Sequence, residues 1–252
     1  MTPLEFAVLG VAGVLAGAIN AVVGSGSLVT FPALLAFGYP PVLANVTNNV
    51  GVLPASLAAT WANRREFAGQ WRRLGVILCF SAAGGVAGAL LLLQLPGEAF
   101  EVIVPVLIVL ALLLVVFGPM IRRWTARLHG EASHRDHPAA TMAVAGLTAV
   151  YGGYFGAAQG VLLLALLSMT MAGTLVRANA YKNAMAAVAN LAAAIVFVSV
   201  AEVAWPAAIA IAIGSFVGGW LGGRYGRHIP QTAYRVVIVA VGLAALVYFL
   251  VT

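Results

Sequence analysis

Eight long apolar stretches, separated by short polar loops, dominate this sequence. A helix needs about 20 apolar residues to cross the hydrocarbon core of a bilayer, where it satisfies its own backbone hydrogen bonds. Because 63% of the residues are hydrophobic and only 8% are charged, a soluble globular protein is excluded. The sequence predicts an all-α polytopic integral membrane protein, a multi-pass protein of the cell (inner or plasma) membrane. The stretches lie at about 4–37, 43–62, 72–95, 100–120, 139–173, 177–200, 204–223 and 232–251.

The charged and redox-active residues exclude several other classes. The net charge is +6, but the arginines stand at the edges of apolar stretches, where they determine topology, and they form no patch that would bind nucleic acid. The single cysteine, Cys79, allows neither an intrachain disulfide nor a thiolate metal site. No catalytic motif stands in a supporting context. We therefore expect no enzyme, no cofactor, no metal and no nucleic-acid partner. The expected surroundings are a lipid bilayer, and a homo-oligomer is compatible with the sequence.

The sequence repeats itself at an offset of 134 residues. At this offset Ala44-Asn45 falls on Ala178-Asn179, and Trp71 falls on Trp205. Further coincidences are Asn49 with Asn183, Leu57-Ala58-Ala59 with Leu191-Ala192-Ala193, Ser81 with Ser215, Gly84-Gly85 with Gly218-Gly219, Gly88 with Gly222, and Pro96 with Pro230. We infer two homologous halves, at 1–118 and 139–252, joined by a polar cytoplasmic linker at 119–138. Internal repeats in a membrane protein indicate a secondary transporter whose substrate binds where the repeats meet.

The first stretch of each half is too long for one simple span. Each has about 35 residues and is interrupted near its middle, by Gly24–Ser27 in one half and by Gly156–Gly160 in the other. The chain therefore makes either eight crossings or ten, and with ten the two halves are inverted. Only ten crossings place Arg177, Arg224 and Arg227 on the same side as the other arginine loops and Glu202 outside, so the distribution of positive charge favours ten.

The first interruption is a candidate binding site. Polar groups inside a membrane segment are costly and indicate function. Asn20 precedes Gly24, Ser25, Gly26 and Ser27, and a break of this kind frees backbone N–H groups at the start of a new helix, where the helix dipole attracts anions. The alternative is that these small residues only allow close helix packing. We favour the anion site because packing requires neither Asn20 nor two serines.

The second candidate is a polar cluster that recurs at the repeat offset. It comprises Asn45, Thr47, Asn48 and Asn49 in one half and Asn179, Lys182 and Asn183 in the other. The alternative is that the asparagines cap the starts of their own helices. Lys182 would either attract an anion or extend its ammonium to the membrane interface.

Other residues complete the hypothesis or are assigned to structure. Gln159, in the second interruption, is a weaker candidate for the site. No acidic residue lies in the middle of a predicted span, so a carboxylate proton relay is not expected and an anion fits the interior better than a cation. The repeated glycines are expected to make close helix contacts: Gly84, Gly85, Gly88, Gly218, Gly219 and Gly222.

These motifs resemble the TauE/SafE family of membrane transporters, many of which are described as sulfite exporters. The resemblance rests on AGAINAVVGSGSLVTFPALLAFGYPPVLANVTNN at 16–49, on the duplicated halves and on RANAYKN at 177–183, and it covers essentially the whole chain. It implies an inner-membrane protein of two related halves that moves small sulfur-containing anions such as sulfite or sulfoacetate, usually outward. The site residues that it implies are Gly24–Ser27, Asn45, Thr47, Asn48, Asn179 and Asn183. The chain departs from the family pattern at GAAQG, residues 156–160, where a more glycine-rich segment is often found.

The hypothesis is an anion transporter that exports small sulfur-containing oxyanions or organosulfonates by alternating access between the two repeats. The rivals are an uptake carrier for the same anions, a channel-like pore and a membrane scaffold that transports nothing.

Overall fold

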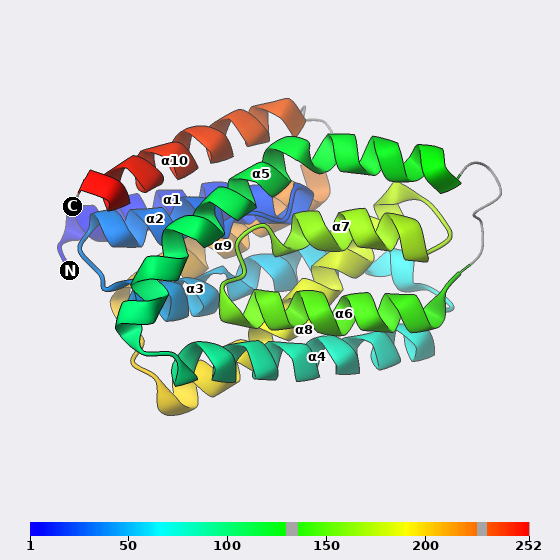
Figure 1. Cartoon of the computed structure of the whole chain (residues 1–252), viewed down its shortest axis with the longest axis horizontal. Coiled ribbons are helices and arrows are strands. Elements are labelled where there is room, and N and C mark those ends of the chain that lie inside the picture. The colour runs from blue at the N-terminus through cyan, green and yellow to red at the C-terminus, as the bar shows by residue number, and fades with distance from the viewer. Residues whose placement is uncertain (130–135, 226–230, 252) are drawn as a thin grey trace.

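The computed structural model describes residues 1–129, 136–225 and 231–251, and in these ranges the chain is α-helical apart from short turns and one 3-10 turn (Figure 1). The helices of the first half are α1 (Pro3–Val22), α2 (Ser27–Ala36), α3 (Pro41–Ala62), α4 (Trp71–Gln94) and α5 (Gly97–His129), with the 3-10 turn η1 at Arg64–Phe67. Those of the second half are α6 (Pro138–Tyr154), α7 (Gln159–Thr170), α8 (Leu175–Val200), α9 (Trp205–Tyr225) and α10 (Gln231–Val251).

Both interruptions predicted from the sequence end one helix and begin another. The first separates α1 from α2, and the second separates α6 from α7. With 10 and 12 residues, α2 and α7 extend only about 15 and 18 Å, too little to cross a hydrocarbon core of about 30 Å. Most residues of α2 are buried, so this short helix lies inside the protein and not against lipid.

The two halves place their helices in the same order and at the same spacing. α3 and α8, α4 and α9, and α5 and α10 each begin 134 residues apart, which is the offset found in the sequence. The contacts follow the same rule: α1 packs on α9 as α6 packs on α4, α3 on α9 as α8 on α4, and α2 on α10 as α7 on α5. These observations agree with two related halves, while the internal repeat stays a prediction.

The packing exchanges one helix between the halves. α9 belongs to the second half but packs on α1 and α3, and α4 of the first half packs on α6 and α8. Two mixed bundles result, one built on α1, α3 and α9 and the other on α4, α6 and α8. The two mixed bundles are joined where α3 and α8 pack on each other.

Repeated glycines bring these helices into backbone contact. A methyl group at Gly88 would collide with the carbonyl of Val150 in α6, and one at Gly222 would collide with Ala18 in α1. Gly84, Gly85, Gly218 and Gly219 are equally close to neighbouring backbone. The interpretation of these glycines as close helix contacts is confirmed.

The two ends of the bundle differ in what they contain. Both the N-terminus and the end of α10 lie at one end, together with the α2–α3 and α8–α9 turns (Figure 1). We call this the termini end. η1, the end of α5, the start of α6 and the α7–α8 turn lie at the other, which we call the linker end (Figure 1). α6 therefore runs opposite to α1, its counterpart at the repeat offset.

The predicted linker at 119–138 is largely divided between helices. Residues 119–129 continue α5, residues 130–135 lie outside the described residues, and α6 begins at Pro138. Arg227, used in the topology argument, also lies outside the described residues. At the linker end Arg73 forms an ion pair with Asp136. The hydrogen bond from Arg73 holds the pKa of the Asp136 carboxyl below its usual value.

Within the described residues, five helices are long and apolar enough to cross a membrane: α1, α4, α8, α9 and the Val102–Met120 part of α5. Large apolar side chains are exposed along them, as a lipid environment requires; Val102 and Val106 are examples. The chain is a helical membrane protein. The choice between eight and ten crossings stays a prediction.

Candidate functional site

The two interruptions meet at the centre of the protein. The N–H of Gly160 donates to the carbonyl of Gly24 at an N···O distance of 3.0 Å, and the Cα atoms leave no room for a side chain on either residue. Gly24 has a left-handed φ of 87°, and Ala158, its counterpart at the repeat offset, has a φ of 60°. The chain thus turns in the same way at both interruptions, although only one of the two has glycine at this position.

The two interruptions differ in the backbone groups that they leave free. At the second, the N–H of Gln159 donates to Gly156 and that of Gly160 to Gly24. At the first, none of the hydrogen bonds formed by the described residues uses the N–H of Ser25, Gly26 or Ser27. Anion binding by free amides is therefore available at Ser25–Ser27, while the Gly160 amide is already occupied.

Buried side chains at both interruptions also have unused polar atoms. Ser25 Oγ and Gln159 Nε2 are buried and have no hydrogen-bond partner. Buried polar groups normally have one, so an unpaired donor or acceptor in a native structure requires an explanation. A polar ligand at the junction of the interruptions would provide it.

The polar cluster of α8 binds the end of α1. The Asn179 and Asn183 amides donate to the Ala21 carbonyl at 3.3 and 3.4 Å, and Lys182 Nζ donates to the carbonyls of Asn20 and Ala21 at 3.1 and 3.4 Å. The last carbonyls of a helix lack partners within it and carry the negative end of its dipole. The cluster therefore satisfies the end of a helix in the other half. It does not cap its own helix, because α8 is capped by Thr174.

Lys182 is a buried basic residue. Its side chain is completely buried, so the alternative in which the ammonium reaches the membrane interface is wrong. In the described part of the chain no carboxylate pairs with Lys182, since the ion pair found there joins Arg73 to Asp136. Helix-end carbonyls offer partial charges only, and a buried ammonium without a full counter-charge is costly.

The corresponding cluster of α3 makes a related contact without a charge. Asn45 donates to the carbonyl of Tyr154, at the end of α6, at 2.8 Å. Asn48, which stands at the position of Lys182, accepts a hydrogen bond from Thr30. Asn45 lies inside α3, whose N-cap is Pro40, so this cluster does not cap its own helix either.

The remaining predicted residues have mainly structural partners. Thr47 Oγ1 accepts from the N–H of Ala204, just before α9. The Asn20 amide donates to Ser56 Oγ at 2.9 Å. Asn49 Oδ1 is buried and has no partner. Thr47 and Asn20 therefore hold helices together, and Asn49 keeps an unused acceptor.

A cavity of about 820 Å³ opens at the linker end and leads to the α8 cluster. Ala21 and Asn179 line it, and Asn179 Oδ1 has no hydrogen-bond partner. Arg64, Arg65 and Arg224 also line it, against a single acidic residue, Glu66. We call this cavity the basic vestibule. Sequence reasoning treated these arginines as topology determinants only, because their convergence on one cavity depends on contacts between α3, η1 and α9.

At the termini end, aromatic side chains cover the junction of the interruptions. Phe31 of α2 and Phe155, next to α6, pack edge to face with ring centroids 5.3 Å apart. Phe100 of α5 contacts both Phe155 and Tyr154, at 6.4 and 5.9 Å. Phe31, Phe100 and Phe155 are buried, so they form an apolar barrier between the junction and the termini end.

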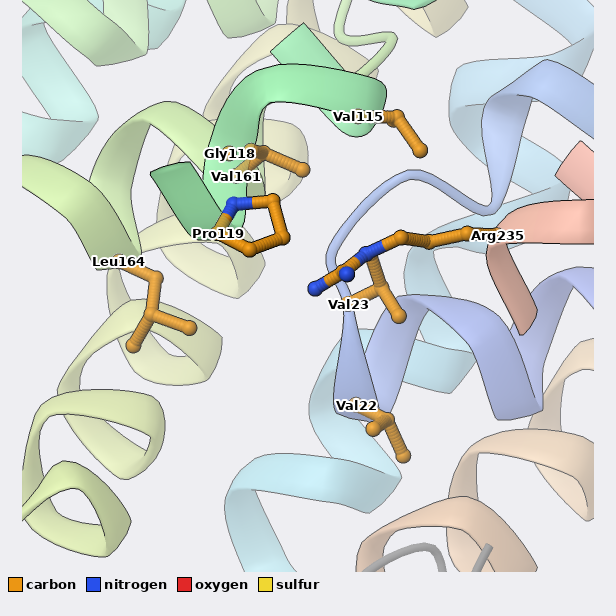
Figure 2. Close-up of a pocket in the computed structure, with 8 residues that line it drawn as sticks. All are labelled: Val22, Val23, Val115, Gly118, Pro119, Val161, Leu164 and Arg235. Carbon is orange, nitrogen blue, oxygen red and sulfur yellow. The ribbon is translucent and has the colours of Figure 1, made fainter. Parts of the chain in front are cut away.

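A second, much smaller cavity lies beside the first interruption. It has a volume of about 20 Å³ and is lined by residues that include Val22, Val23 and Pro119. Arg235 extends from α10 across it toward Pro119 of α5 (Figure 2). A space of this size holds about one water molecule and is too small for a substrate.

The fold and the site define a polytopic helical membrane transporter: interrupted helices meet at the centre, where unpaired polar groups and a buried lysine lie near the inner end of a vestibule. The chain belongs to the Sulfite exporter TauE/SafE family, which matches residues 9–249.

Its relatives carry transporter names. It is 29% identical over 248 residues to "Probable membrane transporter protein YfcA" of Escherichia coli K12, covering 96% of this chain and 88% of that protein. It is 29% identical over 239 residues to "Probable membrane transporter protein ORF9" of Sinorhizobium sp, covering 94% and 89%. A "Probable membrane transporter protein" of Haemophilus influenzae is 27% identical over 237 residues, covering 92% and 89%. No solved structure matches significantly.

Proposed function

We propose that the protein exports small anions, namely sulfur-containing oxyanions or organosulfonates such as sulfite and sulfoacetate, across the cell (inner or plasma) membrane. The observation that carries this proposal is the completely buried Lys182, which has no carboxylate partner in the described part of the chain. A small anion supplies the missing counter-charge. A cation would add to the positive charge already there.

The proposed anion enters through the basic vestibule. Three arginines against one glutamate make the cavity attractive to anions from solution. At its inner end Asn179 has an unused oxygen, which accepts a hydrogen bond from a protonated oxyanion, and Lys182 lies one helical turn further along α8. Deeper still, the amides of Ser25–Ser27 offer donors that suit the several oxygens of sulfite.

The proposed cycle moves one mixed bundle against the other. The vestibule gives access from the linker end, and the aromatic barrier separates the junction from the termini end. Rocking of the α1–α3–α9 bundle against the α4–α6–α8 bundle would close the vestibule and separate the aromatic rings. The two interruptions, which touch through Gly24 and Gly160, would be the pivot.

The proposed direction follows from charge. The arginine-rich linker end is the predicted cytoplasmic side, so the vestibule admits anions from the cell interior. A membrane potential of about 100 mV, negative inside, favours the exit of each negative charge by about 2.3 kcal/mol. Export therefore needs no coupling ion.

The test is uptake of labelled sulfite by proteoliposomes with an imposed potential, with sulfate, sulfoacetate and taurine as competitors. We expect saturable flux that depends on the potential and shows counterflow. The double variant Asn45→Ala/Asn179→Ala should abolish it, while Arg72→Ala, an exposed arginine outside the vestibule, should not. Size-exclusion chromatography checks that the variants remain folded.

The alternatives predict other results. A channel-like pore gives flux without saturation or counterflow, an uptake carrier gives net flux against the proposed direction, and a scaffold gives no flux. No flux of any of the four anions would remove this substrate class.

A further inference from the structure

A second large cavity opens sideways, between the two mixed bundles. Its volume is about 580 Å³, and its lining is almost entirely apolar. Four helices, α3, α4, α8 and α9, and the 3-10 turn η1 supply the lining. We call it the lateral groove. It lies at the ends of α3 and α9 and the start of α4, which places it at the linker end (Figure 1).

Each helix presents one face to the lateral groove. Leu57 and Trp61 of α3, Leu74 and Leu78 of α4, and Phe216 and Trp220 of α9 are pairs spaced by four residues, so each pair projects from the same side of its helix. The walls are exposed, because Trp61, Trp71 and Phe216 are 67%, 61% and 54% accessible. The floor is closed by small buried side chains, Ala184 and Ala187 of α8.

One arginine stands among these apolar residues. Arg64 lines both the lateral groove and the basic vestibule, and its guanidinium lies 4.7 Å from the centre of the Trp61 ring. One of its N–H groups donates to the Trp61 carbonyl at 3.1 Å, which fixes its position. An exposed apolar channel that ends at a positioned arginine has the shape and charge of an acyl chain with an anionic headgroup.

The lining residues of the groove differ from their counterparts at the repeat offset. At 134 residues from Trp61, Arg64 and Phe67 stand Ile195, Val198 and Ala201, and at the same distance from Phe216 and Trp220 stand Ala82 and Val86. The corresponding surface of the other bundle therefore lacks the cation and has no aromatic counterpart of Trp61, Phe216 or Trp220. It keeps one large aromatic residue, Trp205, at the position of Trp71. Ordinary contact with bulk lipid would not require this difference between the two surfaces.

We propose that the lateral groove binds one acyl chain of an anionic phospholipid, whose phosphate is held by Arg64. Basic positions between helices on the cytoplasmic side of a membrane are suited to anionic headgroups. Trp61, Trp71 and Trp220 place amphipathic rings at the depth of the headgroups, which anchors the groove at the interface. The bound lipid rests against both mixed bundles.

Tryptophan quenching by brominated lipid tests the proposal. The chain has five tryptophans, so single-tryptophan variants that keep Trp61 or Trp71, with phenylalanine at the other four positions, report on the groove. A variant that keeps only Trp205, the counterpart of Trp71 at the other end, reports on bulk lipid. Each is reconstituted in phosphatidylcholine vesicles with increasing fractions of brominated phosphatidylglycerol or brominated phosphatidylcholine.

We expect the groove tryptophans to reach half-maximal quenching at about a fivefold lower fraction of phosphatidylglycerol than of phosphatidylcholine. One arginine near a membrane surface contributes about 1 kcal/mol, which corresponds to that ratio. Trp205 should show no preference. Arg64→Ala should remove the preference, and Arg72→Ala, an exposed arginine on the same side that does not line the groove, should keep it.

A second variant tests the chain site separately from the headgroup. Val188→Phe fills the groove from α8 and should reduce quenching of Trp61 by both brominated lipids to the level seen for Trp205. Equal quenching of Trp61, Trp71 and Trp205 by both lipids would overturn the proposal. So would a preference that survives Arg64→Ala.

Discussion

The two interruptions of the helices occupy equivalent positions but have different chemistry. At the first, glycine takes the left-handed position and the amides of Ser25–Ser27 are unused. The helix α1, which precedes this interruption, has its last carbonyls hydrogen-bonded by Lys182. At the second, alanine takes that position and the Gly160 amide is occupied. The basic vestibule leads to the end of α1, and the aromatic barrier covers the end of α6. The two halves share the order and spacing of their helices, and in our proposal a few differing residues assign the anion to one side.

The largest expected effect is on transport and concerns Lys182 and its counterpart Asn48. Lys182→Asn makes the two sides alike and should lower sulfite flux about 30-fold or more, because it removes a buried charge from its proposed partner. Asn48→Ala, which removes an acceptor for Thr30, should change flux less than about threefold. Initial rates in proteoliposomes measure both.

The stability of the lysine variants separates a binding role from a structural one. A buried ammonium without a full counter-charge is costly, but Lys182 also donates to the carbonyls of Asn20 and Ala21. Because these two effects oppose each other, Lys182→Met should change the melting temperature little while it removes transport. Equal loss of flux in the Lys182 and Asn48 variants would contradict the assignment of the anion to one side.

The next effect has opposite signs at the two interruptions. Gly24→Ala should lower the melting temperature strongly, because the left-handed conformation costs about 1–2 kcal/mol and the new methyl collides with Gly160. Ala158→Gly removes the same kind of strain and should be neutral or stabilising by up to about 1 kcal/mol. Thermal melts of both variants measure the difference, and a stabilised Gly24→Ala protein would refute the described contact.

A smaller effect tests the symmetry of the packing. Gly88→Ala and Gly222→Ala place methyl groups against the backbone of α6 and α1 and should each destabilise by about 1–3 kcal/mol. Gly75→Ala, in the same helix as Gly88 but with open space around it, should be neutral or stabilising. If all three variants changed the melting temperature equally, helix propensity and not helix contact would determine the effect of these substitutions.

The smallest expected effect is at the linker end. Asp136→Asn loses charge-assisted hydrogen bonds to Arg73 and should cost at most about 1 kcal/mol, as exposed ion pairs do. Because the folded pKa of Asp136 lies below its ordinary value of 3.8, its contribution is complete at neutral pH and is lost as the pH falls through the lowered pKa. Melts at pH 7 and at about pH 3 should show the difference from the wild type shrinking with acidification.

Much of the helix arrangement could be predicted from the sequence. Apolar length and the 134-residue offset located the interruptions and the repeated glycine contacts, because these depend on local pattern. The partners of Asn45 and Lys182 could not be predicted, since the carbonyls that they bind belong to the other half. The exchange of α4 and α9 between the two halves could not be predicted for the same reason. Burial was the missing information for Lys182, whose position one turn into an apolar segment fits an interfacial lysine equally well.

Cysteine accessibility tests the central claim most directly, namely that an anion reaches Lys182 through the basic vestibule. In a Cys79→Ser background, Val176→Cys lies in the vestibule one turn from Asn179, and Val42→Cys stands at the equivalent position at the termini end. The readout is the rate of modification by an anionic thiosulfonate, with and without sulfoacetate, because sulfite would itself consume the reagent. We predict fast modification of Val176→Cys, protection by sulfoacetate that Lys182→Met abolishes, and slow modification of Val42→Cys without protection. Equal rates at the two positions, or protection that persists in Lys182→Met, would contradict the account.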